Sequence, residues 1–413
     1  MWKIVYNILL HLLLPFFLLY SLTNRKIRGN LSERLWPCTN RPDIKDAIWI
    51  HAASIGEAVI AETIVNYMRS RRDFNNFLIT VNTHYSRDML RKKFGNRVGV
   101  YSLPVDLTYS LKHFIGSSTF RALLIVETEI WPNLIWQAKK RNIPVIIVNG
   151  RISDKTSNSY RFFSFFLKNV FSDVSLVIAQ SEEHARRFKS SGIDASKIKI
   201  SGNIKYYRDI DIEYNKLHKE NIITFGSIKE KELVEVLQTV DMLKKRFSFF
   251  RFFIVPRELN LVNAIENVLD SRLKTMRYSV YKKSSAETVR DIEIVVVDTV
   301  GDLLDVYRKS MVAFVGGSLA PYGGQNILEP LFFGTPVIFG QYIENFRDIA
   351  DTILKGGAGF MVASREELFE KICLLIENSD LREKMGVEGR RIIEAQKEVM
   401  AMTADIIADK MTA

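Results

Sequence analysis

The sequence predicts an α/β protein built from two domains, each a parallel sheet covered by helices on both faces. Short apolar runs alternate with helical patterns along the chain, which is typical of such sheets. The 413 residues are enough for two ordinary domains. A polar, charged segment at residues 206–221 has no clean strand and separates two alternating series. We therefore expect a domain on each side of this segment.

Composition restricts the partners of the protein. Hydrophobic residues make up 47% of the chain and charged residues 25%, as in a folded globular protein. The net charge of +11 favours acidic partners, such as nucleic acid, anionic lipid or a phosphorylated substrate. No nucleic-acid-binding motif is recognisable. The two cysteines, Cys38 and Cys373, form no metal-binding pattern and fit a reducing compartment.

An apolar stretch at residues 4–22 indicates membrane attachment. As a helix it could cross about 30 Å of hydrocarbon. It lacks the basic start and the small-residue cleavage site of a signal peptide. Arg25, Lys26 and Arg28 follow directly, and the positive-inside rule then places the body of the protein in the cytoplasm. The stretch either spans the inner membrane or lies on its surface; both arrangements keep the protein at the cytoplasmic face of that membrane.

The predicted strands define the domain boundaries. The first series is 47–52, 77–81, 121–126, 144–149, 176–180 and 198–201, and the second is 222–225, 252–255, 293–297, 311–315 and 336–339. We expect an anchor at 1–24, a first domain at 25–205, a linker at 206–221 and a second domain at 222–413. Ligands of such sheets bind beyond the carboxyl ends of the strands, where most of the candidate residues lie.

A glycine-rich stretch, GGSLAPYGGQNILEP, occupies residues 316–330 and follows a predicted strand. Glycines allow tight turns and close approach to a ligand. Asn326 is a good N-cap for a following helix, whose unpaired N–H groups and dipole would suit a phosphate. Glu329 has two possible roles: a capping-box partner of Asn326, or an acceptor for ribose hydroxyl groups.

This stretch resembles the nucleotide-binding motif of the 3-deoxy-D-manno-octulosonic acid (Kdo) transferases, which build the inner core of bacterial lipopolysaccharide. The resemblance runs from about residue 4 to 362, in order through HAASIGEA, ETEIWPNL, NGRISDKT, GNIKYY, VPRE, DTVGDL and GGQNILEP. It implies a GT-B glycosyltransferase with two Rossmann-like domains facing across a cleft. It also implies inverting transfer of Kdo from CMP-Kdo to a lipid A precursor, a tetraacyl disaccharide bisphosphate, without a metal or another cofactor.

In the first domain the resemblance implies three catalytic residues. Glu57 matches the family's catalytic base, which takes the proton of the acceptor hydroxyl; alternatively it complements a helix dipole. Glu127 and Lys205 match positions that stabilise the charge separated in the transition state, the alternative being an ordinary ion pair. Glu129 is a nearby alternative to Glu127, with a structural role in the turn before Pro132.

In the second domain the resemblance implies a CMP site built from three segments. These are Pro256 and Arg257; Gly301, Asp302 and Leu303; and Asn326, Ile327, Leu328 and Glu329. A guanidinium such as that of Arg257 pairs well with phosphate oxygens. The chain departs from the family at Asp302, usually Glu, at Gln325, commonly His, and in the segments 225–229 and 258–260, so the fine geometry of donor binding stays open.

Two basic clusters, 69–72 and 91–93, allow two interpretations. They are either solvated helix faces or contacts to anionic headgroups.

The expected partners are CMP-Kdo, the lipid A precursor and the phospholipid surface. Two other functions are compatible with the fold: a GT-B transferase using another sugar nucleotide such as UDP-GlcNAc, and an inactive membrane-bound scaffold. The presence of Glu57, Lys205, Arg257 and Glu329 argues against the scaffold.

Overall fold

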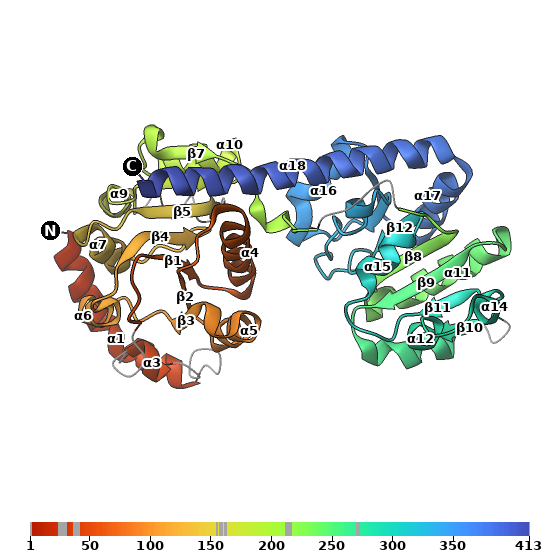
Figure 1. The fold of residues 1–413 in the computed structure, drawn as a ribbon, viewed down its shortest axis with the longest axis horizontal. Helices are drawn as coiled ribbons and strands as arrows, with labels where there is room; N and C mark the ends of the chain where they lie inside the picture. Colours follow the sequence, from red (N-terminus) through yellow and green to blue (C-terminus); the bar gives the residue numbers. More distant parts are fainter. Residues whose placement is uncertain are drawn as a thin grey trace. The chain divides into compact units, whose positions relative to one another are not determined.

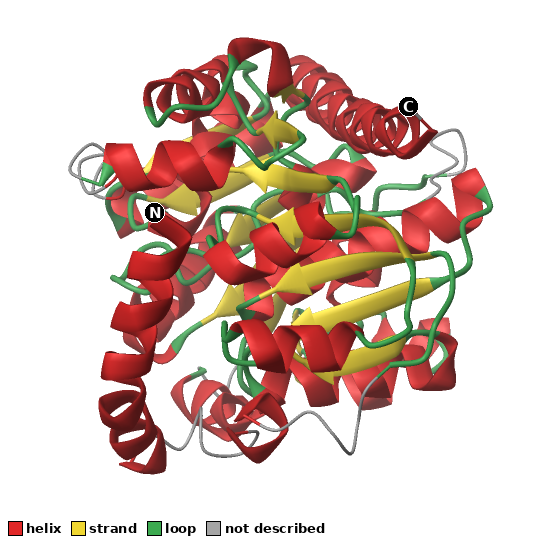
Figure 2. Ribbon diagram, turned by 90° about the vertical axis from the view of Figure 1, so that its left-hand side faces the viewer, coloured by secondary structure: helices red, strands yellow, loops and turns green. Residues whose placement is uncertain are grey.

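The chain forms two compact units, each with its own parallel sheet (Figure 1). The computed structural model describes residues 2–23, 31–35, 42–153, 156, 160, 163–210, 217–269 and 273–412. The first unit comprises Met1–Asp209 and Gln396–Ala413, and the second comprises Ile210–Ala395. Helices cover the strands of the sheets, as Figure 2 shows in red and yellow.

The sheet of the first unit has its switch point between β1 and β4. Its strands are β1 (Ala47–Ala52), β2 (Phe77–Val81), β3 (Gly99–Ser102), β4 (Phe120–Val126), β5 (Val145–Gly150), β6 (Leu176–Ala179) and β7 (Ile198–Ile200). They lie in the order β3-β2-β1-β4-β5-β6-β7. Strand β1 pairs in parallel with both β2 and β4, so the chain winds outward in both directions from this point. The carboxyl ends beside such a switch point form the usual ligand site.

Helices bury both faces of this sheet. Helices α4 (Ile55–Arg72) and α5 (His84–Phe94) pack on one face, and α6 (Thr108–Ile115), α7 (Pro132–Lys140), α9 (Ser164–Phe171) and α10 (Glu182–Ser190) contribute to the opposite core. Strand β1 is buried at every position because alternate side chains enter the two cores: Ile48 and Ile50 the first, Trp49 the second. This two-sided burial explains the uninterrupted apolar runs in the sequence.

The second unit repeats the plan with a switch point between β8 and β12. Its strands are β8 (Ile222–Ile228), β9 (Arg251–Pro256), β10 (Thr275–Arg277), β11 (Ile294–Val296), β12 (Val312–Val315), β13 (Val337–Gly340) and β14 (Gly359–Val362), in the order β10-β11-β9-β8-β12-β13-β14. Helices α11 (Leu233–Arg246), α12 (Val262–Val268) and α17 (Arg365–Glu377) share one core, and α13 (Tyr278–Tyr281) and α15 (Leu303–Lys309) contribute to the other. The short α14 (Ala286–Val289) and the helix α16 (Arg347–Lys355) complete the unit.

The long C-terminal helix α18 (Ser379–Thr412) ends inside the first unit. Met400, Ala404 and Ile407 are fully buried in the core that also contains α4. The Thr403 hydroxyl donates to Ser201 Oγ at 2.8 Å. The boundaries expected from the sequence, which assigned all of 222–413 to the second domain, are therefore wrong at this end of the chain.

The N-terminal helix α1 (Trp2–Thr23) is apolar and long enough to cross a membrane by length and composition, and its first turns dock on the first unit. Tyr6 Oη donates to Asp106 Oδ2 at 2.8 Å. The side-chain amides of Asn7 and Asn133 exchange hydrogen bonds at 3.1 and 2.9 Å. The docked end is thus held by buried polar partners. The basic residues 25, 26 and 28 lie outside the described part of the chain.

Candidate active site

Acidic and basic side chains gather at the switch point of the first unit. Glu57 lies in the first turn of α4, directly after β1, and Glu127 follows β4. Arg151 follows β5, and Lys205 lies in a short 3-10 helix, η4 (Ile204–Tyr206), after β7. Burial raises the pKa of Glu127, while Arg151 and Lys205 lower it and the charge of Glu57 raises it further. These groups therefore act electrostatically on one another, and the three predicted catalytic residues belong to one site.

The local geometry of Glu57 is compatible with both of its possible roles, stabilising the start of α4 and acting as a catalytic base. Glu57 Oε2 accepts from the Ala53 N–H at 2.8 Å, and Oε1 accepts from the Ser54 hydroxyl at 2.7 Å. Ser54, the N-cap of α4, accepts in turn from the Glu57 N–H. The carboxylate is 7% exposed and fixed at the helix terminus. A carboxylate has about four lone-pair sites, so the two capping bonds leave acceptor capacity for a substrate hydroxyl.

The backbone of Glu127 adopts a left-handed conformation, with φ of 60°. This conformation is uncommon for a residue other than glycine. Its N–H donates to the Val148 carbonyl of β5 at 2.8 Å, which ties the end of β4 to the neighbouring strand. Such conformations cost about 1–3 kcal/mol, persist only where the surroundings enforce them, and cluster at functional sites. The geometry of Glu127 agrees with a functional role.

Lys205 is positioned by a residue that the sequence analysis did not single out, Asn149. Asn149 is the penultimate residue of β5, has φ of 57° and is 1% exposed. Its Oδ1 accepts from the Ile204 N–H at 3.0 Å, while Asn203 Oδ1 accepts from the Lys205 N–H at 3.0 Å. Two asparagine side chains thereby fix the short helix that carries Lys205.

Glu129 is a carboxyl group that can exchange a proton near neutral pH. Burial, followed by the charge of Glu57, raises its pKa to about 7, and Glu127 contributes in the same direction. Carboxylates placed close together share protons because they resist simultaneous ionisation. The site therefore combines two carboxyl groups of raised pKa, Glu127 and Glu129, with the cations of Arg151 and Lys205.

The glycine-rich stretch of the second unit does not form the helix expected to start at Asn326. Residues 326–329 form a turn that leads into a 3-10 helix, η8 (Pro330–Phe333). Pro330 lacks an N–H for α-helical bonding, and Gly334, with φ of 61°, ends the segment. Asn326 Oδ1 accepts from the Leu328 N–H at 3.2 Å, and its Nδ2 donates to Glu329 Oε1 at 3.2 Å.

The other residues predicted to bind CMP collect at the same edge of this sheet, beyond β9, β11 and β12. The Arg257 N–H donates to the Ile228 carbonyl at 2.8 Å, and the Arg257 side chain is exposed. Pro256 ends β9. Ile327 and Leu328 are fully buried, so they support the segment from inside the unit.

The loop after β11 holds Asp302 in an internal network. Asp302 accepts from Thr299 Oγ1 at 2.5 Å and from Lys282 Nζ at 3.0 Å, and these bonds lower its pKa. Gly301 has φ of 97°, so the loop turns there, and Leu303 begins α15. The carboxylate at position 302 therefore orders this loop.

Glu232 organises the glycine-rich loop and escaped the sequence analysis. It is fully buried, and its carboxylate accepts from the N–H groups of Gly317, of Ser318 and Leu319 at 3.2 Å, and of Lys229 at 2.9 Å. A Cβ on Gly316 would lie 2.4 Å from Glu232 Oε1, so glycine is required there. In the sequence Glu232 belongs to a charged run, KEKE, that resembles a solvated surface.

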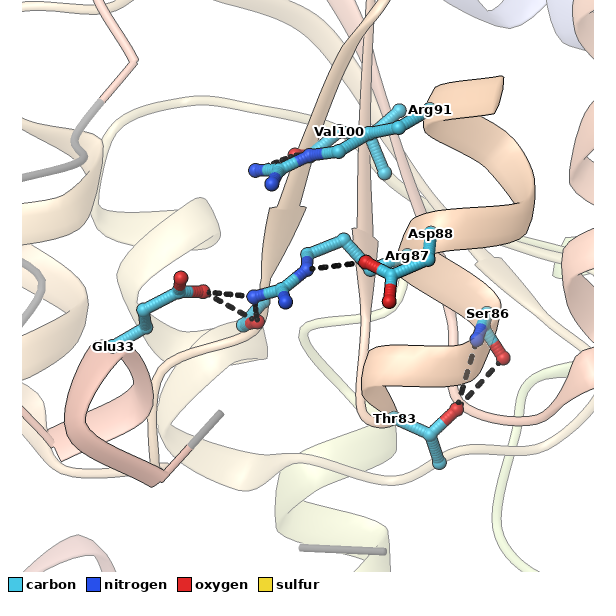
Figure 3. A network of polar contacts seen from close by, with 8 residues as sticks. Glu33, Thr83, Ser86, Arg87, Asp88, Arg91 and Val100 are labelled. Carbon is cyan, nitrogen blue, oxygen red and sulfur yellow. Dashed lines mark hydrogen bonds and ion pairs between the residues drawn. The ribbon is translucent and has the colours of Figure 1, made fainter. Parts of the chain in front are cut away.

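Several cationic side chains of the two basic clusters form hydrogen bonds or ion pairs within the protein. Arg91 donates through Nε and Nη2 to the Val100 carbonyl at 3.1 and 2.9 Å (Figure 3). Lys93 pairs with Glu62, and Arg72 pairs with Asp405 of α18. Figure 3 also shows Arg87 bound to Glu33 of α3 (Leu31–Leu35), which attaches the segment after α1 to this region. These contacts favour a structural role for much of both clusters.

The described residues contain no group of three or more His, Cys, Asp or Glu side chains that could hold a metal ion.

Two Rossmann-like sheets, each with candidate residues beyond the carboxyl ends beside its switch point, define the GT-B class of glycosyltransferases. Solved structures agree at the level of the fold. Acinetobacter baumannii MurG matches with a TM-score of 0.54 at 14% identity, covering 88% of this chain and 99% of that one. A glycosyltransferase from Rickettsia africae matches with a TM-score of 0.54 at 16% identity, covering 89% and 98%.

Sequence comparison identifies the family. Residues 29–208 match the model of the 3-deoxy-D-manno-octulosonic-acid transferases (kdotransferases). The chain is 30% identical to the Kdo transferase of Aquifex aeolicus, covering 83% of this chain and 90% of that one, and 29% identical to that of Haemophilus influenzae, covering 98% of both. The chain belongs to the Kdo transferase family, and it is a glycosyltransferase.

A further relative is longer than this chain. The bifunctional glycosyltransferase/methyltransferase of Fusobacterium nucleatum is 34% identical over 92% of this chain. The chain spans 59% of the length of that relative.

Proposed function

We propose that the protein transfers Kdo from CMP-Kdo to a lipid A precursor at the membrane, with inversion at the anomeric carbon. The observation that carries this proposal is the cluster of Glu57, Glu127, Glu129, Arg151 and Lys205 at the switch point of the first unit. This cluster supplies a fixed proton acceptor, carboxylates and cations at one sheet edge. Family membership supports Kdo as the transferred sugar.

The reaction requires one proton transfer and one displacement. An acceptor hydroxyl gives its proton to Glu57 as its oxygen bonds to the anomeric carbon. The bond from that carbon to the CMP phosphate oxygen breaks, and its electron pair leaves with CMP. Glu127 complements the positive charge that develops on the sugar, and Lys205 complements the charge on the departing phosphate.

The second unit supplies the donor site in this proposal. Arg257 is exposed beyond β9 and would pair with the phosphate of CMP. Glu329, held by Asn326, would accept from the ribose hydroxyls. Ile327 and Leu328, which are fully buried, would anchor this site from inside the unit.

For the membrane, the docking of α1 favours a helix that lies in the interface. Its first two turns bind Asp106 and Asn133 of the first unit, which removes them from the hydrocarbon. The following residues 8–23 extend about 24 Å as a helix, short of the roughly 30 Å needed to span a bilayer. Exposed apolar side chains along this part form the lipid-facing surface: Ile8, Leu9, Leu12, Leu13, Phe16 and Leu19. Phe165 of α9, 71% exposed and in contact with Trp2, extends it.

The decisive experiment is incubation of the purified protein with CMP-Kdo and a tetraacyl lipid A precursor, followed by mass spectrometry of the lipid. We expect the mass of one or more Kdo residues to be added. UDP-GlcNAc serves as the competing donor, and the Glu57→Gln protein serves as the inactive control. Addition of N-acetylhexosamine in place of Kdo would contradict the proposal, as would an unchanged lipid mass with every donor.

A further inference from the structure

Three cations surround the glycine-rich loop of the second unit, and the proposed function uses only Arg257. The other two are Lys229 and Lys231, which lie between β8 and α11, on the switch-point side of the sheet. In the described part of the chain, no carboxylate lies within ion-pair distance of any of the three side chains. Other cations of the second unit differ: Lys244, for example, pairs with Glu293, and Lys282 with Asp302.

The main chain of Lys229 is fixed to the glycine-rich loop through Glu232. The Lys229 N–H donates to Glu232 Oε1 at 2.9 Å, and the same carboxylate accepts from the N–H groups of Gly317, Ser318 and Leu319. Ser227, two residues earlier, has φ of 58° and is 6% exposed, so the chain turns sharply at the end of β8. Lys229 is therefore held in place before any ligand binds.

The side chains of both lysines lie over the ring of Tyr322, in the glycine-rich loop. Lys229 Nζ lies 4.7 Å and Lys231 Nζ 5.8 Å from the centroid of its ring. The Lys231 N–H donates to Tyr322 Oη at 3.2 Å. Cation–π contacts of this kind contribute only about 0.5–1 kcal/mol at exposed sites. Two ammonium groups over one ring still repel each other, so an anion placed beside them would relieve an uncompensated charge.

The loop cannot neutralise a donor phosphate with the N–H groups of 317–319, because Glu232 already accepts from them. The charge of the donor must then be met by side chains at this edge. We propose that Lys229 and Lys231 bind an anionic group of the sugar-nucleotide donor, with Glu232 as the positioning residue of both the lysines and the loop. The inference rests on the proposed function, and it adds the residues that recognise the donor's charge. CMP-Kdo offers two such groups, the phosphodiester and the sugar carboxylate.

The test compares ligands that differ in charge. CMP and uncharged cytidine are titrated calorimetrically into the wild type and into Lys229→Gln and Lys231→Gln, and KM for CMP-Kdo is measured for each protein. The matched control is Lys245→Gln, which removes an exposed lysine from the last turn of α11, where it pairs with Asp241. We expect the affinity of the two loop variants for CMP to fall about tenfold, since hydrogen bonds to charged groups are worth about 1.5–3 kcal/mol. The affinity for cytidine should stay unchanged.

The outcomes distinguish the phosphate from the sugar carboxylate as the bound anion, and they distinguish failure of this inference from failure of the proposed function. A loss of CMP affinity assigns the lysines to the phosphate, whereas unchanged CMP affinity with a raised KM for CMP-Kdo assigns them to the sugar carboxylate. The inference is refuted if both variants keep the wild-type CMP affinity and the wild-type KM for CMP-Kdo. It is also refuted if cytidine and CMP lose affinity equally, or if Lys245→Gln has the same effect as the loop variants. Failure of the wild type to bind CMP or use CMP-Kdo would instead refute the proposed function.

Discussion

Ser54 and Glu57 bind each other through two reciprocal hydrogen bonds, one from the Ser54 hydroxyl to the carboxylate and one from the Glu57 N–H to Ser54 Oγ. Because Ser54 caps α4 while Glu57 is the proposed base, substitutions at the two positions can separate the capping of the helix from catalysis. Glu57→Gln should abolish transfer while CMP binding persists, because a general base typically supplies about 10²–10⁴-fold in rate. Ser54→Ala should lower stability by about 1 kcal/mol and leave most of the turnover. Turnover and thermal unfolding are measured for both variants. An equal loss of turnover in both would show that Glu57 only caps the helix and is not the base.

Glu129→Gln should stabilise the protein increasingly as the pH rises from about 4.5 to 7, and by a constant amount above pH 7. The pKa of Glu129 is raised from 4.5 to about 7, so its contribution to stability is complete below about pH 4.5 and is lost as the pH rises through 7. Glutamine mimics the protonated form at every pH. The melting temperature of the variant relative to wild type should therefore rise between pH 5 and pH 8.5, by about 2 °C or more. A constant difference across this range would show that Glu129 ionises normally.

Arg257→Ala and Glu329→Ala should weaken nucleotide binding in different ways. Loss of the guanidinium should reduce the affinity for CMP more than that for cytidine, because only CMP carries a phosphate. Loss of Glu329 should reduce both affinities alike, since both ligands carry the ribose. Calorimetric titration distinguishes these patterns. Unchanged CMP affinity in both variants would place the nucleotide elsewhere.

Transfer should continue in excess EDTA. In the proposed mechanism the charge on the leaving CMP is met by Lys205 and by the cations around the glycine-rich loop. The measurement is the initial rate of Kdo transfer before and after chelation. A rate that collapses with EDTA and returns with added Mg²⁺ would contradict this mechanism.

Charged substitutions on the lipid-facing side of α1 should separate membrane attachment from catalysis. Leu12→Lys with Phe16→Lys places charges at positions 64% and 69% exposed and keeps the docking through Tyr6 and Asn7. Transfer to acceptor in vesicles should fall sharply, because co-localisation raises the effective concentration, while transfer to detergent-dispersed acceptor should change little. Deleting residues 1–22 is a less specific test, since it also removes Tyr6 from the buried Asp106. Equal losses in both assays would make the helix part of the acceptor site.

Every interior strand was predictable from the sequence, whereas three of the four edge strands were not. The predicted strands 47–52 and 77–81 coincide with β1 and β2, which are buried at every position. The strands that were missed, β3, β10 and β14, lie at sheet edges, are three or four residues long, and each contain partly exposed residues. An edge strand packs on fewer neighbours, so a short sequence without a continuous apolar run suffices to form it.

The placement of Glu57 and Glu127 beyond strand ends was predictable from the sequence, because each follows an apolar strand closely. The site was not predictable where a side chain accepts from backbone N–H groups distant in sequence. Asn149 accepts from a residue 55 positions away, and Glu232 from one 85 positions away. Nothing local in the sequence encodes such pairs. The expected helix at Asn326 failed for a local reason, the proline at position 330.

The burial of the last turns of α18 in the first unit has a consequence for biosynthesis. Met400, Ala404 and Ile407 leave the ribosome after the whole second unit, yet they fill the core beside α4. Domains usually fold in order of synthesis, but here the second unit can close while the first still lacks a strip of its core. A nascent or truncated chain ending near residue 395 would expose that apolar surface and leave Ser201 without Thr403. Synthesis of the last residues of the chain is therefore needed to complete the core of the first unit.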